Sequence, residues 1–286
     1  MAPAAKPKHK GKKKRLISTR YTSPFRYPGG KNWFLVTARR WLKKKCKPST
    51  VLIEPFAGGA GISLAAVREG LVKKVIFAET DPNVAATWET ILNGHALWLA
   101  DEIRSFRVSR ERVEEVLSRE PDCIHKRAFQ CLLRNRTARG GVLKRGAGLL
   151  RRGEDGRGLR SRWYPDALAQ RIEIISALKN DLEFCNRDGF ELIREYLCEP
   201  DAVFFVDPPY TKAARRLYEQ WEIDHAKLFA TLSQARGAVL MTYDDTPEVR
   251  KWAEANGFKV RRISMRTTHH TQKRELMISR DFGWLQ

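Results

Sequence analysis

Residues 51–61 read VLIEPFAGGAG, a short apolar run that passes directly into a glycine-rich turn. The run 51–53 is typical of a buried strand, and residues 62–69 have the composition of a helix. A second apolar run, residues 75–78, follows and ends in acidic residues. This order of strand, glycine turn, helix, strand and acid predicts a parallel nucleotide-binding unit of an α/β fold.

The same α/β alternation resumes in the second half of the chain. An amphipathic helix containing Trp33 precedes the glycine turn, and later segments supply further elements. We expect helices at about 168–178, 224–235 and 247–256, and strands at 202–206, 238–243, 259–265 and 275–279. The fold class predicted is α/β, a Rossmann-like mixed sheet with a mostly helical insert.

The charge balance favours a polyanionic partner. The chain carries 54 Lys+Arg against 33 Asp+Glu, a net charge of +21. Seven of the basic residues lie within the first fifteen positions, which contain no acid, so the rest of the chain is basic as well. A merely soluble surface mixes the two signs more evenly. Nucleic acid is the usual partner of such a field.

The middle of the chain is rich in arginine and glycine. Residues 134–162 hold ten basic residues against Glu154 and Asp155, and glycines interrupt the segment so often that no helix or strand period survives. Such segments are often passive loops. This one lies between folded halves, and arginine suits contacts to phosphate and to guanine. We therefore predict a recognition insert for double-stranded DNA.

The glycine turn does not have the spacing of known phosphate-binding loops. It is not G-x-G-x-x-G, and no Lys-[Ser/Thr] follows it, which argues against NAD and ATP. A cofactor without phosphate, such as S-adenosylmethionine, needs only a close turn and an acceptor for its ribose hydroxyls. Glu79 is placed for that role, and Asp81 is the competing candidate. A purely structural glycine turn is the alternative.

A second motif, Asp207-Pro208-Pro209-Tyr210, follows the predicted strand 202–206. The exocyclic amine of adenine is a poor nucleophile because its lone pair is delocalised into the ring. The Asp207 carboxylate and the Pro208 carbonyl can accept its two N–H bonds, and consecutive prolines hold these acceptors in place. Tyr210 can stack on a base that has been flipped out of the duplex. An incidental turn is again the alternative.

These motifs, in this order, resemble those of the DNA adenine methylase (Dam-like) family of S-adenosylmethionine-dependent amino-methyltransferases. The resemblance rests on RYPGGK at residues 26–31, EPFAG at 54–58 and DPPY at 207–210, with weaker similarity at 186–190, 239–246 and 273–277. The insert is richer in Arg and Gly than the family pattern, so the family's recognition sequence does not carry over.

The resemblance implies a role for individual residues. The catalytic residues would be Asp207, Pro208 and Tyr210. The cofactor would be bound by Tyr27, Lys31, Glu54, Phe56, Ala57, Gly58, Glu79, Asp188 and Asp207. DNA would be contacted by Arg134, Asn135, Arg136, Arg139, Arg145 and Arg160. The implied organisation is a disordered basic tail (1–20), a catalytic methyltransferase domain (21–104 and 166–286) and a target-recognition insert (105–165).

Two other functions compete with this interpretation. One is methylation of RNA or of the cytosine amine, which usually goes with a different first residue in the Pro-Pro-Tyr motif. The other is a DNA-binding protein that has kept the fold without activity, which the intact Asp207 argues against. The sequence leaves open the recognition site and whether a cognate restriction endonuclease accompanies the protein.

Other sequence features argue against disulfides, a metal site, a membrane span and a signal peptide. The five cysteines include no C-x-x-C pair and indicate buried reduced thiols in a cytoplasmic protein. His269-His270 lacks acidic or thiol neighbours, so we expect no metal. No apolar stretch is long enough to span a membrane, and no signal peptide is recognisable.

Overall fold

The computed structural model describes residues 23–26, 30–143, 147–153, 156–210, 223–266 and 272–286. The helices are α1 (Leu35–Lys45), α2 (Gly61–Arg68), α3 (Pro82–Leu92), α4 (Ala96–Ser105), α5 (Arg110–Ser118), α6 (Ile124–Thr137), α7 (Pro165–Ala177), α8 (Gly189–Tyr196), α10 (His225–Leu232) and α11 (Pro247–Ala255). The strands are β1 (Val51–Glu54), β2 (Lys74–Ala78), β3 (Leu182–Cys185), β4 (Ala202–Val206), β5 (Val239–Asp244), β6 (Lys259–Arg266) and β7 (Gln272–Ser279).

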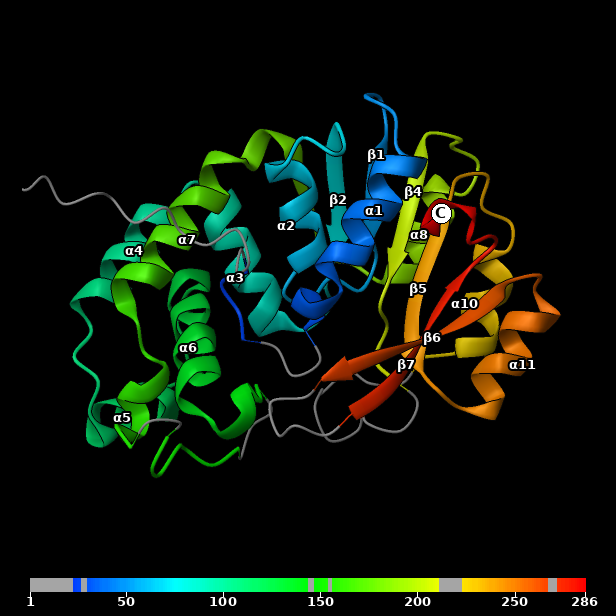
Figure 1. The fold of residues 1–286 in the computed structure, drawn as a ribbon. Coiled ribbons are helices and arrows are strands. Elements are labelled where there is room, and N and C mark those ends of the chain that lie inside the picture. Colours follow the sequence, from blue (N-terminus) through cyan, green and yellow to red (C-terminus); the bar gives the residue numbers. More distant parts are fainter. Residues whose placement is uncertain (1–22, 27–29, 144–146, 154–155, 211–222, 267–271) are drawn as a thin grey trace, which may run out of the picture.

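The strands form one mixed sheet in the order β3-β2-β1-β4-β5-β7-β6 (Figure 1). The first five strands of this order pair in parallel, and β7 runs antiparallel to both β5 and β6. This is the predicted Rossmann-like sheet, and the fold class is confirmed. The strand order reverses between β1 and β4, and the carboxyl ends at such a reversal are where open α/β sheets bind ligands.

Successive side chains of the buried strands belong to two different hydrophobic cores. On β1, Leu52 belongs to one apolar cluster and Ile53 to the other; on β4, Phe205 and Phe204 divide in the same way. Residues of α1, α2 and α3 complete the first cluster, and residues of α8, α10 and α11 complete the second. Because successive side chains of a strand point to opposite faces of the sheet, the two clusters lie on opposite faces, and helices cover both.

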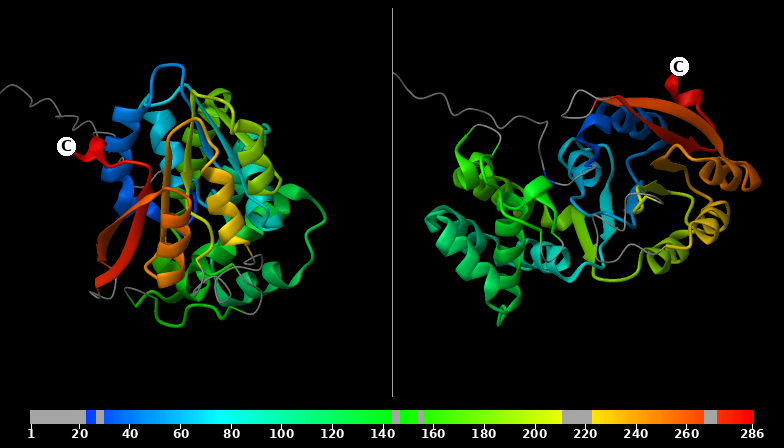
Figure 2. Two further views of the ribbon diagram at one scale, coloured as in Figure 1. Left: turned by 90° about the vertical axis from the view of Figure 1, so that its right-hand side faces the viewer. Right: turned by 90° about the horizontal axis from the view of Figure 1, so that it is seen from below.

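A helical lobe, α4 to α7, lies beside the sheet on the side of α3 (Figures 1 and 2). Helix α6 packs against α3, and α4 packs against α7. The predicted insert limits, residues 105 and 165, fall at the end of α4 and the start of α7. Since these two helices pack on each other, the lobe as a packed unit extends to both of them.

Strand β3 and helix α8 are two of the elements that were not predicted from the sequence; the positions of α3, α4, α5 and α6 were not predicted either. Strand β3 is only four residues long, and α8 follows it after a short turn. The five cysteines are free, as expected, but only Cys131 is buried, and Cys123 and Cys198 are exposed. Among the described residues, no helix is both long and apolar enough to cross a membrane.

Candidate active site

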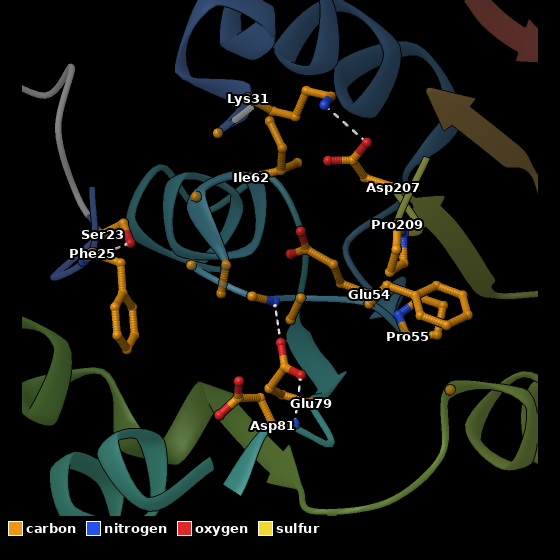
Figure 3. Close-up of a pocket in the computed structure, with 18 of the residues that line it drawn as sticks. Ser23, Phe25, Lys31, Glu54, Pro55, Ile62, Glu79, Asp81, Asp207 and Pro209 are labelled. Atoms are coloured by element: carbon orange, nitrogen blue, oxygen red, sulfur yellow. Dashed lines mark hydrogen bonds and ion pairs between the residues drawn. The ribbon is translucent and has the colours of Figure 1, made fainter. Parts of the chain in front are cut away.

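A pocket lies at the carboxyl ends of β1 and β4, beside the reversal in strand order (Figure 3). Its volume is about 1210 Å³ when the part open to solvent is included. The glycine turn 54–62 forms its floor, and residues from six other segments complete it. These include Lys31, Glu79, Asp81, Asp188, Asp207 and Pro209. The pocket thus brings together predicted cofactor residues and one predicted catalytic residue.

Glu79 connects the glycine turn to the end of β2. Its Oε2 accepts a hydrogen bond from the Gly58 amide at 3.0 Å, and its Oε1 accepts from the amides of Thr80 and Asp81 at 2.8 and 2.9 Å. Burial raises the pKa of Glu79 to about 7, although the three amides act in the opposite direction. A carboxylate oxygen can accept two hydrogen bonds. Oε1 already accepts two, whereas Oε2 accepts the one from Gly58, so Glu79 can hold the turn and still accept from a ligand through Oε2.

Glu54 ends β1 at the base of the pocket and is 3% exposed. Its Oε2 accepts from the Ser63 amide at 3.2 Å and from the Ser63 hydroxyl. Burial raises the pKa of Glu54 to about 8, more than these hydrogen bonds lower it. A cation placed beside Glu54 would favour the ionised carboxylate and would itself be stabilised.

Asp81 and Asp188 each cap a helix at the rim of the pocket. Asp81 accepts from Asn83 N at 2.8 Å and Val84 N at 3.3 Å, at the start of α3. Asp188 accepts from Phe190 N at 2.7 Å, at the start of α8. A Cβ on Gly189 would lie 2.5 Å from the carbonyl oxygen of Pro55, so only glycine allows α8 to start this close to the turn.

Asp207 follows β4, and two donors hold its carboxylate. Lys31 Nζ lies 2.9 Å from Oδ1, and the Thr242 hydroxyl donates to the same oxygen at 2.7 Å. In Figure 3 the other carboxylate oxygen of Asp207 points toward Ile62 and the interior of the pocket. The arrangement fixes the carboxylate through one oxygen and presents the second to a ligand.

Pro208 and Tyr210 are close to this site but do not line the pocket. Pro208 is buried, and Tyr210 is half-buried. The Tyr210 ring stacks near Tyr243, with centroids 6.2 Å apart, and its hydroxyl donates to Glu275 Oε2 at 2.8 Å. The stacking of Tyr210 on a flipped base stays a prediction.

Two of the residues predicted to contact DNA are buried instead. Asn135 is 0% exposed and Arg136 4%. Asn135 accepts from the Arg26 amide at 2.8 Å and donates to the carbonyls of Arg26 and Gly141, and Arg136 donates to the Pro24 carbonyl at 2.5 Å. These contacts tie the end of α6 to residues 24–26, which is a structural role. They disagree with the direct DNA contacts expected of Asn135 and Arg136.

The remaining predicted residues divide between the surface, the turn and the undescribed part of the chain. Arg139 and Arg160 are exposed, and Arg134 is half-buried. Phe56, Ala57 and Gly58 all line the pocket. Tyr27 and Arg145 lie outside the described residues. Within the described part of the chain, no group of three or more His, Cys, Asp or Glu side chains could hold a metal ion.

The sequence interpretation missed Thr242 and Glu275. Both lie in segments whose weaker similarity to the family was noted, 239–246 and 273–277, but neither was given a role. The pairing of β5 with β7 brings the two segments side by side, with Thr242 opposite Met277 and Asp244 opposite Glu275. Only the sheet register places these polar side chains next to the Asp207 motif.

Residues 150–268 match the model of the D12 class N6 adenine-specific DNA methyltransferases. The matched part includes Asp188 and the Asp207–Tyr210 motif. No curated protein matches this sequence.

Solved structures give weaker likenesses. A provisionally described RNA methyltransferase of Pyrococcus horikoshii aligns with a TM-score of 0.41 and 14% identity, over 89% of this chain and 82% of that one. An rRNA methylase of Streptococcus thermophilus aligns with a TM-score of 0.38 and 9% identity, over 85% and 93%. The fold assignment rests on the strand order rather than on these scores.

The family match agrees with the motifs, the sheet and the pocket. It confirms the resemblance noted in the sequence, and with it the expectation of S-adenosylmethionine as cofactor. The protein is a methyltransferase with a Rossmann-like fold that uses S-adenosylmethionine, and its residues 150–268 carry the signature of the D12 class N6 adenine-specific DNA methyltransferases.

Proposed function

We propose that this protein transfers a methyl group from S-adenosylmethionine to the exocyclic N6 amine of adenine in double-stranded DNA. The observation that carries the proposal is the placement of Asp207. Its carboxylate lies at the carboxyl end of β4, is held through one oxygen by Lys31 and Thr242, and borders the pocket.

The pocket residues fit the cofactor. Five carboxylates of the described residues line the pocket, those of Glu54, Glu79, Asp81, Asp188 and Asp207. Lys31, the one basic side chain among the described lining residues, is paired with Asp207. This set suits a ligand with a cationic end and hydroxyl donors, and it disfavours a phosphate. Glu54 would hold the ammonium of the methionine end, Glu79 the ribose, and Asp188 the adenine amine. When bound, the cofactor supplies an electrophilic methyl group on a sulfonium.

Asp207 and Pro208 would act on the target amine. An N–H donated to Asp207 and another donated to the Pro208 carbonyl would draw the two hydrogens out of the ring plane, which restores a lone pair to the nitrogen. Because the acceptors are fixed before the base arrives, no rearrangement is needed during the reaction. The transfer would be direct, with no covalent intermediate with the protein: the N–C bond forms as the C–S bond of the sulfonium breaks. The methylated amine would then lose one N–H proton, which the Asp207 carboxylate can accept and pass to water.

DNA is the proposed substrate because of the motif and the charge. Asp207, as the first residue of the motif that continues with Pro-Pro-Tyr, favours the adenine amine as methyl acceptor. The positive net charge of the chain favours a polyanionic substrate. A base inside a duplex must be flipped to reach Asp207. Incubation with tritium-labelled cofactor should label duplex DNA. Labelling of RNA alone would contradict the proposal and favour the rival function.

Cofactor affinity should rise with pH between about 6 and 7.5. The pKa values of Glu54 and Glu79 are raised to about 8 and about 7, so both carboxyls are largely protonated at pH 6. A bound ammonium favours the ionised form, so binding releases protons and tightens as pH rises, about tenfold per pH unit for each proton released. The α-amino group of the cofactor stays mostly charged below about pH 7.7.

Calorimetry in buffers of different ionisation enthalpy would count the protons released. Glu54→Gln cannot ionise and should release fewer protons than the unaltered protein at pH 6.5. If the unaltered protein releases no protons when it binds the cofactor, the assignment of Glu54 to the ammonium is wrong.

The exposed arginines of the insert should set the target sequence. Arg139→Ala or Arg160→Ala should relax the methylated sequence, since one bidentate contact to guanine provides about 1–3 kcal/mol of discrimination. Arg194→Ala on α8 is the control: it also removes one positive charge, but outside the insert, and should leave the methylated DNA sequence unchanged. Sequencing of methylated sites distinguishes these results. If neither Arg139→Ala nor Arg160→Ala changes the methylated sequence, the target sequence is not set by these residues.

A further inference from the structure

Glu275 lies on β7, where the strand passes the Asp207 motif. Its side chain is 1% exposed. Its Oε2 accepts from the Tyr210 hydroxyl at 2.8 Å and lies 3.7 Å from Lys31 Nζ. The same ammonium lies 2.9 Å from Asp207 Oδ1 and 4.9 Å from the centre of the Tyr210 ring. One buried carboxylate therefore contacts both the aromatic ring and the cation that holds Asp207.

The buried charge of Glu275 affects Asp207 through the lysine that the two carboxylates share. A buried carboxylate is costly unless it is paired and hydrogen-bonded. Here two carboxylates, Asp207 and Glu275, share one ammonium, Lys31, so their ionised group carries a net negative charge. Because Lys31 is attracted to both, it neutralises Asp207 only in part. Asp207 thereby remains a stronger acceptor for an N–H than it would be in an isolated ion pair.

We propose that Glu275 is a positioning residue for methyl transfer. It fixes the Tyr210 hydroxyl and shares Lys31 with Asp207, so that the ring that would receive the target base and the carboxylate that would accept its amine are aligned together. This inference rests on the proposed function, and it adds a residue of β7 to a site otherwise built from the turn 54–62, β2, β4 and their neighbours.

Two substitutions separate the contributions of Glu275. Glu275→Gln keeps an acceptor for Tyr210 but removes the charge shared with Lys31, and should lower kcat about tenfold. Glu275→Ala removes both and should lower kcat about 100-fold, within the range for the loss of a preorganised polar contact. The dissociation constants of cofactor and nucleic acid should stay within about threefold, because Glu275 acts on the reacting groups rather than on binding.

The measurement is kcat per cofactor-binding site, which corrects for misfolded protein. Met277→Leu is the matched control, since Met277 is buried on the same strand two residues away and on the same face. It should leave kcat within about twofold. A Tyr210→Phe/Glu275→Ala double variant should be at most about threefold slower than Glu275→Ala, because both changes break the same contact.

The comparison uses whichever nucleic acid the unaltered protein methylates. If that is RNA, the proposed function fails and the inference about Glu275 is still tested. A kcat of Glu275→Ala within threefold of the unaltered protein would overturn the inference, and so would a loss of cofactor binding that accounts for the whole loss of rate. Absence of methyl transfer to any nucleic acid would overturn both proposals.

Discussion

Replacement of Asp207 by alanine should lower the rate of methyl transfer by at least about 100-fold while cofactor affinity changes only a few-fold. The carboxylate is proposed to act on the target amine in the transition state, and loss of one preorganised polar contact of this kind costs about 100- to 1000-fold. Lys31 would remain next to Glu275, 3.7 Å away, so the substitution does not leave a buried cation without a counter-charge. Single-turnover rates and cofactor titration measure the two quantities separately.

Asp207→Asn is the matched variant. Its side chain has the same shape, and its amide oxygen can still accept from Thr242, which lies 2.7 Å from Oδ1. It keeps the local structure but loses the charge, so its rate should also fall by at least about tenfold. A rate for Asp207→Ala above a few per cent of the unaltered protein would show that Asp207 does not have the proposed role.

The second large effect is expected at Glu79. Glu79→Ala should weaken cofactor binding by about 1.5–3 kcal/mol, the range for hydrogen bonds to a charged group. The structure adds a second reason, because Glu79 also accepts from the amides of Gly58, Thr80 and Asp81 and so holds the turn in place. Isothermal calorimetry of cofactor binding gives the difference directly.

Asp81 is the competing candidate for the ribose contact, and its capping role allows a clean control. Asp81→Asn retains a good N-cap for α3, so the helix start is preserved and only the carboxylate is lost. We expect it to change cofactor affinity by less than Glu79→Ala does. If Asp81→Asn weakens binding more, the ribose contact lies two residues later than proposed.

The sheet was predictable because its central strands are short, apolar and separated by glycine or acidic turns. The glycine turn 54–61, the strand 202–206 and the helix at 247–256 were all located from composition and periodicity. Strand β3 and helix α8 were not, since β3 has only four residues and three of them are partly or fully exposed. Its position at the edge of the sheet depends on pairing with β2, which local sequence does not reveal.

The candidate site was predictable only where one segment carries the chemistry. Glu79 and Asp207 each follow a strand in a recognisable motif. The roles of Lys31 and Glu275 depend on tertiary contacts, because 244 positions separate two residues whose charged atoms lie 3.7 Å apart. The family resemblance implied that Lys31 binds the cofactor. In the structure Lys31 lines the pocket, and its ammonium is also paired with Asp207, which the sequence did not predict.

Charge composition indicated a polyanionic partner but could not distinguish surface arginines from buried ones. The family resemblance implied that Asn135 and Arg136 contact DNA. They lie instead in the last turn of a packed helix, α6, and their hydrogen bonds go to the backbone at 24–26 and 141. Burial of this kind is set by the packing of α6 against the chain before the sheet, which composition does not encode.

The most direct test of the account is the identity of the methylated nucleoside. Duplex DNA would be incubated with the protein and labelled S-adenosylmethionine, digested to nucleosides and analysed by mass spectrometry, with Asp207→Ala as the blank. The account predicts N6-methyldeoxyadenosine as the labelled product and none above background in the blank. Label in a cytosine nucleoside, or in RNA but not in DNA, would contradict it.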